Sequence, residues 1–152
     1  MKRHRLALLL VLGAAFAVRG EEREERLDGS HVKVGQTYRF KLAAENTAAW
    51  EVVSKTDDEV KYRIRLTVAG KESPAKDEVS TFALKRKTDG KAPTGDKETL
   101  KVSGVEFPCT ILETESGGTK VKTWRSEKFP EIVKVMLDKD VTSELVEIAS
   151  PK

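Results

Sequence analysis

The sequence predicts an all-β fold, an antiparallel meander of about nine strands forming a closed or partly open barrel, with a sandwich as the alternative. Three observations predict it. Apolar and polar residues alternate with a period of two over most of the chain after His31, as in strands with one buried face. Short segments rich in Gly, Asp and Pro separate these runs, and short connections join antiparallel neighbours. No segment after the first twenty residues has the pattern of an amphipathic helix that would cover a broad open sheet.

The first element is a secretory signal peptide, predicted at residues 1–17. Three basic residues among the first five precede an apolar run from Leu6 to Val18, which contains the small-residue pattern Ala15-Phe16-Ala17. The run has about 13 residues, fewer than the ~20 that span a bilayer as a helix. We therefore expect cleavage after Ala17 and an exported, soluble product, periplasmic or extracellular, with no membrane span in the mature chain. Val18 rather than cysteine follows the cut, which argues against lipid attachment.

Removal of this segment balances the charge. The whole chain has 28 basic and 25 acidic residues, and three of the basic ones precede the cut, which leaves 25 of each sign. The basic pI therefore does not argue for nucleic acid as a partner. Residues 18–30 include the charged stretch Glu21–Arg26, which has no apolar face and predicts a flexible tether. Residues 31–150 are long enough for a single β domain with its own core.

The strands follow in order from the alternation. The run Val60–Val68 is the cleanest, because every even position is apolar or aromatic and every odd one is polar. The first strand shows the same pattern at Val34, Tyr38, Phe40 and Leu42. The strands are expected at about 34–42, from 50 onward, 60–68, 78–86, 100–102, 105–111, 119–126, 132–137 and 141–148. Turns are expected at 56–59, 70–76, 103–104, 117–118 and 138–140, and the longest exposed loop at 87–97.

Few residues of the mature chain carry catalytic or metal-binding chemistry. His31 is its one histidine and Cys109 its one cysteine, so neither a catalytic triad nor a zinc or copper site is expected, and no cofactor is implied. We expect His31 to be exposed. Cys109 shares its strand face with apolar residues and is expected to be buried, although a free thiol that pairs with a partner chain is an alternative. The acidic groups Asp57–Glu59 and Asp138–Asp140 fit turns, and a carboxylate-dependent hydrolase is the remaining enzymatic alternative.

Two sets of side chains are candidates for binding. The aromatic residues of the apolar face fit a packed core, or else line a cavity for a lipid or another hydrophobic ligand if the sheet closes only partly. These candidate ligand-binding residues are Tyr38, Phe40, Trp50, Tyr62, Phe82, Phe107 and Trp124. Basic residues on the outer faces of the first and third strands fit cross-strand ion pairs, or else a stripe for an anionic partner. They are Lys33, Arg39, Lys41, Lys61, Arg63 and Arg65.

One set of segments in the last part of the chain comprises Gly104-Val105-Glu106-Phe107-Pro108-Cys109, Lys122–Ser126, Phe129-Pro130 and Glu144–Glu147. This set resembles small exported bacterial β domains of unassigned function. These are distantly similar to the half-barrels that carry outer-membrane lipoproteins. The resemblance covers about the last 50 residues and implies a curved antiparallel sheet with a concave apolar face to which Phe107, Cys109 and Trp124 contribute. The carriers have helices that cover the half-barrel, and no such helix is expected here.

The function expected first is binding of a protein, glycan or surface partner by a non-catalytic exported domain. A carrier of a small hydrophobic ligand is the second hypothesis. A small outer-membrane barrel is a third, although the Phe, Tyr and Trp residues of the mature chain are few for two interfacial girdles of aromatic residues. The sequence does not identify the partner or the oligomeric state.

Overall fold

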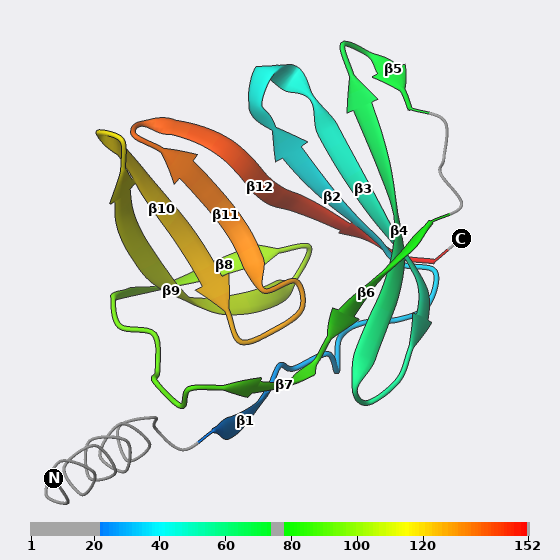
Figure 1. Ribbon diagram of the computed structural model, residues 1–152. Coiled ribbons are helices and arrows are strands. Elements are labelled where there is room, and N and C mark those ends of the chain that lie inside the picture. The colour runs from blue at the N-terminus through cyan, green and yellow to red at the C-terminus, as the bar shows by residue number, and fades with distance from the viewer. Residues whose placement is uncertain (1–21, 74–77, 152) are drawn as a thin grey trace, which may run out of the picture.

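Strands make up most of the chain that the computed structural model describes, residues 22–73 and 78–151, and they confirm the all-β prediction (Figure 1). The predicted signal peptide lies outside the described residues. The strands are β1 (Arg23–Arg26), β2 (Thr37–Leu42), β3 (Thr47–Lys55), β4 (Glu59–Val68), β5 (Lys71–Glu72), β6 (Val79–Ala83), β7 (Lys85–Thr88), β8 (Asp96–Val102), β9 (Val105–Ser116), β10 (Thr119–Ser126), β11 (Ile132–Leu137) and β12 (Asp140–Ala149). A short 3-10 turn, η1 (Ala43–Glu45), lies between β2 and β3.

Ten of these strands form one antiparallel sheet with the order β5-β4-β3-β2-β12-β11-β10-β9-β8, and β6 pairs with β4 beside β5. The sheet therefore consists of two meanders, β2–β6 and β8–β12, which are joined where the last strand pairs with β2. Figure 1 shows that the sheet curves strongly about this junction. It does not close into a barrel, because no pairing joins β8 to β4, β5 or β6 among the described strands.

The register keeps the apolar residues of neighbouring strands on the same face. Trp50 lies opposite Ile64, and Tyr38 lies opposite Trp50, so the apolar positions of three adjacent strands share one inner face. On the other side of β2, Leu145 lies opposite Phe40. Register shifts occur in β10–β11, β11–β12, β12–β2 and β3–β4, and such bulges increase the local twist of a sheet. The predicted alternation thus becomes a continuous, curved apolar surface.

The predicted tether is wrong for Arg23–Arg26, which form strand β1 paired with β7 in a separate two-stranded sheet. These residues have no apolar stripe, and charged side chains fix the strand instead. Glu131, which precedes β11, accepts hydrogen bonds from Arg86 of β7 and Arg125 of β10. Glu25 of β1 also accepts a hydrogen bond from Arg86, at 3.0 Å. The four side chains are 15–29% exposed, so this charge cluster holds the β1–β7 pair against the main sheet.

The segment after β1 closes one end of the curved sheet. Leu27 N–H donates to the Leu84 carbonyl, Asp28 N–H donates to the Glu127 carbonyl, and Phe129 N–H donates to the Asp28 carbonyl. Leu27 and Phe129 are buried at 2% and 0% exposed. Two segments far apart in the sequence therefore lie together at this end and bring apolar side chains into the core.

Several predicted boundaries differ from the structure. The predicted strand 78–86 is divided at Leu84, which is 2% exposed and donates its N–H to the Asp58 carbonyl, and after it the chain leaves β4 and pairs with β1. Val34 is 56% exposed and precedes β2, so it does not share the inner face as predicted. The second strand begins at Thr47 rather than at Trp50. The long exposed loop is shorter than predicted, because β7 and β8 take residues from both of its ends.

Candidate functional site

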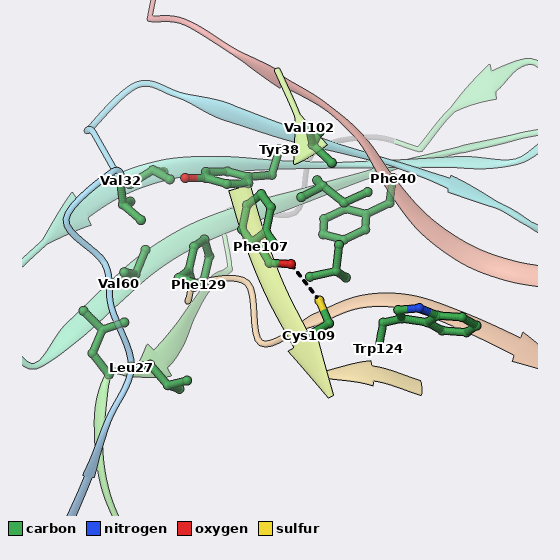
Figure 2. Packing of buried hydrophobic residues seen from close by; sticks show 14 of the residues in the cluster. Leu27, Val32, Tyr38, Phe40, Val60, Val102, Phe107, Cys109, Trp124 and Phe129 are labelled. Carbon is green, nitrogen blue, oxygen red and sulfur yellow. Dashed lines mark hydrogen bonds between the residues drawn. The ribbon is translucent and has the colours of Figure 1, made fainter. Parts of the chain in front are cut away.

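The aromatic residues of the predicted ligand-binding set lie in or against the core cluster of the inner face. Figure 2 shows the four that are buried, Tyr38, Phe40, Phe107 and Trp124. Tyr38, Phe40, Phe107 and Trp124 are 0–6% exposed. Trp50, Tyr62 and Phe82 are partly buried and pack against the same cluster. The ring of Trp50 lies 4.7 Å from that of Tyr62 and 4.5 Å from that of Phe40, measured between centroids. These side chains fill much of the apolar face, and their role in binding a ligand stays a prediction.

Phe129, which the sequence reasoning missed, is the centre of this cluster. Its ring centroid lies 5.2 Å from those of Tyr38 and Phe82, 6.0 Å from that of Tyr62 and 6.3 Å from that of Trp50. It lies in the connection between β10 and β11, where no alternation marks a buried position.

Trp124 lies apart from the other aromatic rings of Figure 2. Its indole N–H donates to the Glu98 carboxylate of β8, and the Lys134 ammonium lies 5.0 Å from the ring centroid. Lys134 is also 3.8 Å from Glu144. The structure therefore does not bring Trp124 into one aromatic site with Trp50 and Tyr62.

The inner face is exposed toward the far end of β4. Ile64, Leu66 and Val68 are 36%, 41% and 50% exposed, although they share the face of the buried Val60. The aromatic side chains that cover the first half of the strand do not extend this far. An apolar strip thus continues from the core to the surface.

A groove of about 680 Å³ lies on the opposite, outer face of β2, β3, β4, β5 and β12. Most of the lining residues alternate with the core positions, which places them on this face, whereas Phe40 and Ala48 of the lining belong to the core itself. They are Gly35, Thr37, Arg39, Phe40, Thr47, Ala48, Ala49, Glu51, Arg65, Thr67, Glu72, Val146, Ala149, Ser150 and Pro151. The small side chains of Ala49 and Ala149 leave the middle hollow, and Val146, which is 50% exposed, adds an apolar surface. We call this hollow the outer groove.

Charged side chains of both signs border the outer groove. Arg39 lies 3.4 Å from Glu147 of the neighbouring strand, and Arg65 lies 3.5 Å from Glu51 of its neighbour. Two of the six residues of the predicted basic row, Arg39 and Arg65, thus form cross-strand ion pairs. All four side chains are 38–56% exposed, so the pairs contribute little to folding and remain accessible to a ligand. Arg63, next along the row, has a buried Nε with no hydrogen-bond partner among the described residues.

His31 is not exposed as predicted but packs against the core. Its ring lies 5.6 Å from that of Phe107, and its Nε2 is 2.7 Å from the Phe129 carbonyl oxygen. With Nε2–H donating to this carbonyl, Nδ1 is the unprotonated nitrogen, and it is buried with no partner in the described part of the chain. Burial lowers the pKa of His31. The Phe129 carbonyl and Asp28 raise it to a smaller extent, and Lys128 and Lys55 lower it.

We therefore expect the free energy of unfolding to fall as the pH is lowered below about 6.5, because the unfolded chain takes up a proton on His31 before the folded chain does. The loss should end at the folded-state pKa and should be absent above about pH 7.5. Urea unfolding across this range measures it. His31→Gln removes the titrating group and should flatten the dependence. An unchanged slope in this variant would contradict the assignment.

Cys109 is buried, as expected, at 3% exposed. Its thiol donates to the Phe107 carbonyl at 3.3 Å. Burial, together with the nearby Glu98 charge, raises the pKa of this thiol to about 11. The thiolate form is therefore rare at neutral pH, which makes the sulfur a poor nucleophile or metal ligand. Within residues 22–73 and 78–151, no group of three or more His, Cys, Asp or Glu side chains is placed to hold a metal ion.

Comparisons of the chain with protein-family models, with curated proteins and with solved structures found no match. In the part of the chain that the structure describes, no helix has the length and apolarity needed to cross a membrane.

Proposed function

We propose that the mature chain is an exported, non-catalytic domain that binds a segment of a partner protein in the outer groove. The observation that carries the proposal is the hollow itself. Its volume of about 680 Å³ is in the range of sites that enclose a ligand. It lies on a sheet face that the fold does not use for its own core.

The lining favours a polypeptide over a glycan. Alanine, valine and proline side chains offer a narrow apolar surface, and Arg39, Arg65, Glu51 and Glu72 supply charges of both signs around it. A peptide segment with small apolar side chains flanked by charged ones complements this arrangement. Glycan sites commonly use exposed aromatic rings, against which sugar rings stack. The single aromatic residue of the lining, Phe40, is 4% exposed and offers no such surface.

Ala49→Trp is the variant that tests the groove. Ala49 lies between Arg39 and Arg65 in the register, so an indole there would occupy the middle of the hollow. Peptides are first selected from a displayed random library on the immobilised wild-type protein, and their dissociation constants are then measured by titration. We expect the variant to weaken them by at least about tenfold. Thr114→Trp, at an exposed position of β9 outside the groove, is the matched control and should bind normally.

Selected peptides that bind Ala49→Trp as tightly as the wild type would contradict the proposed site. A parallel screen on a glycan array separates the two partner classes. If the wild type binds a glycan but no peptide, and Ala49→Trp abolishes the glycan binding, then the ligand of the outer groove is a sugar and not a polypeptide.

The exposed strip Ile64, Leu66 and Val68 favours a second candidate function, the binding of a small apolar ligand at the open end of the inner face. Such a ligand should raise the melting temperature of the wild type, as measured with a fatty acid and with a hydrophobic dye. Leu66→Lys should remove the shift. If neither compound changes the melting temperature, this candidate fails.

A further inference from the structure

Among the described residues, strand β8 forms an edge of the main sheet. It pairs with β9 on one side and is the last strand in the sheet order (Figure 1). Asp96, Lys97, Glu98, Thr99 and Lys101 are exposed. An edge strand of this kind carries backbone N–H and C=O groups that another extended chain can pair with.

The hairpin that joins β8 to β9 shows which backbone groups are free. Ser103 and Gly104 both have positive φ, 49° and 82°, which is typical of a two-residue type I′ turn. In such a hairpin, the residues that flank the turn, Val102 and Val105, form a hydrogen-bonded pair. Hydrogen-bonded pairs alternate along an antiparallel ladder, so Lys101, Thr99 and Lys97 direct their backbone groups away from β9. Thr99 lies opposite Pro108 in a pair that is not hydrogen-bonded. The lack of an N–H group on Pro108 therefore removes no hydrogen bond between β8 and β9.

The side chains around this edge have a definite charge pattern. Lys97, Thr99 and Lys101 share one face of β8 because alternate residues point the same way. The Lys97 ammonium donates to the Thr110 hydroxyl of the neighbouring strand β9 at 2.6 Å, which keeps it on this face. The three free backbone positions are therefore also the positions that place two cations on this face.

We propose that β8 binds an extended segment of a partner protein as an added strand, and that this segment has acidic residues at alternate positions. Backbone pairing with Lys97, Thr99 and Lys101 supplies the affinity, and the two lysine ammonium groups select carboxylates opposite them. The site is independent of the outer groove, which β2, β3, β4, β5 and β12 form.

A second copy of the chain is a poor occupant of the same edge. Two-fold pairing over the full strand would be centred on Thr99 and would place Lys97 of one copy opposite Lys101 of the other. Like charges directly opposite each other destabilise a strand pair. Lysine on an edge strand is a common means of blocking association between identical chains, and here it also favours an acidic segment.

The test uses synthetic peptides that alternate glutamate with valine or threonine, titrated against the mature protein by fluorescence anisotropy. We expect saturable binding, together with slower amide hydrogen exchange at Lys97, Thr99 and Lys101. The same peptides N-methylated at alternate residues keep their charge but lose the backbone donors, and they should not bind. Lys101→Glu should weaken binding by about tenfold or more.

Thr99→Pro removes one free N–H without removing a bond to β9, so it should prevent strand addition and leave the protein folded. Thr99→Ala is the matched control and should bind, as should Ala49→Trp. The proposal is overturned if none of the acidic peptides binds at up to about 1 mM, or if Thr99→Pro binds them normally. It is also overturned if sedimentation shows a dimer that Thr99→Pro dissociates, since a second copy would then occupy the edge.

Discussion

Replacement of Phe129 with alanine should lower the free energy of unfolding by about 3–5 kcal/mol, a large part of the ~5–15 kcal/mol typical of a domain. The phenylalanine ring is fully buried and contacts four aromatic side chains, one from each of four strands of the first meander. Its removal leaves a cavity at the closed end of the sheet, where the surrounding rings cannot collapse without shifting their strands. Urea unfolding followed by circular dichroism measures the change.

Val34→Ala provides the control for this variant. Val34 is 56% exposed, so its truncation should change stability by less than about 0.5 kcal/mol. If Phe129→Ala lowered the free energy of unfolding no more than Val34→Ala does, that result would contradict the burial of Phe129 at the closed end of the sheet. Phe129→Leu fills part of the space and should be intermediate.

The second large effect is expected at Glu131. Its carboxylate accepts hydrogen bonds from both Arg86 and Arg125, and its side chain is 15% exposed. Glu131→Gln leaves two partly buried guanidinium groups with only Glu25 to balance them. We expect a loss of about 2–3 kcal/mol, less than for a fully buried pair because the arginine side chains are each 27% exposed. Amide hydrogen exchange in β1 and β7 should also become faster.

The acid side of the stability profile provides a further readout of the same site. Burial raises the pKa of Glu131, but the hydrogen bond from Arg86 and the charges of Arg125 and Arg86 outweigh it, so the pKa is lowered below 4.5. The unfolded chain therefore binds a proton at this carboxylate first as the pH falls, and stability is lost below about pH 4.5. Glu131→Gln should show a shallower loss there.

Glu113→Gln is the matched control for the charge change. Glu113 pairs with Lys122 at 3.7 Å on an exposed part of the sheet, and their side chains are 50% and 43% exposed. Its replacement should cost less than about 0.5 kcal/mol. Equal effects of the two substitutions would mean that the charge cluster does not hold the β1–β7 pair.

The local pattern of the sequence predicts most strands well. The alternation in Val60–Val68 lies within β4, and the turn residues Ser103 and Gly104 lie between β8 and β9, where the structure has them. Both predictions rest on interactions between residues close in the sequence. Burial of Cys109 also followed from the alternation, because its strand neighbours at even spacing are apolar.

The failures have a common physical cause. Strand β1, the buried Leu84 and the partly buried His31 depend on partners distant in the sequence. Arg86 lies 61 residues from Glu25 of β1, and Phe129 lies 98 residues from His31. The N–H of Leu84 donates to the carbonyl of Asp58 on another strand connection. No local pattern in Glu21–Arg26 reveals that a compensating charge cluster exists elsewhere. The outer groove was missed for the same reason. Ala49 of β3 and the lining residues of β12 lie on either side of β2, so the groove depends on the pairing of β2 with both strands.

By itself the sequence determined that this chain is an antiparallel β protein, where its main turns lie and which face of each long strand is apolar, because side-chain alternation and turn chemistry act over a few residues. Only the tertiary structure decided that the two meanders join through β12 and β2, that the sheet stays open at β8, and that aromatic rings fill the inner face while a hollow forms on the outer one. These features depend on the pairing of distant strands and on the curvature of the whole sheet, and neither is written in the spacing of neighbouring residues.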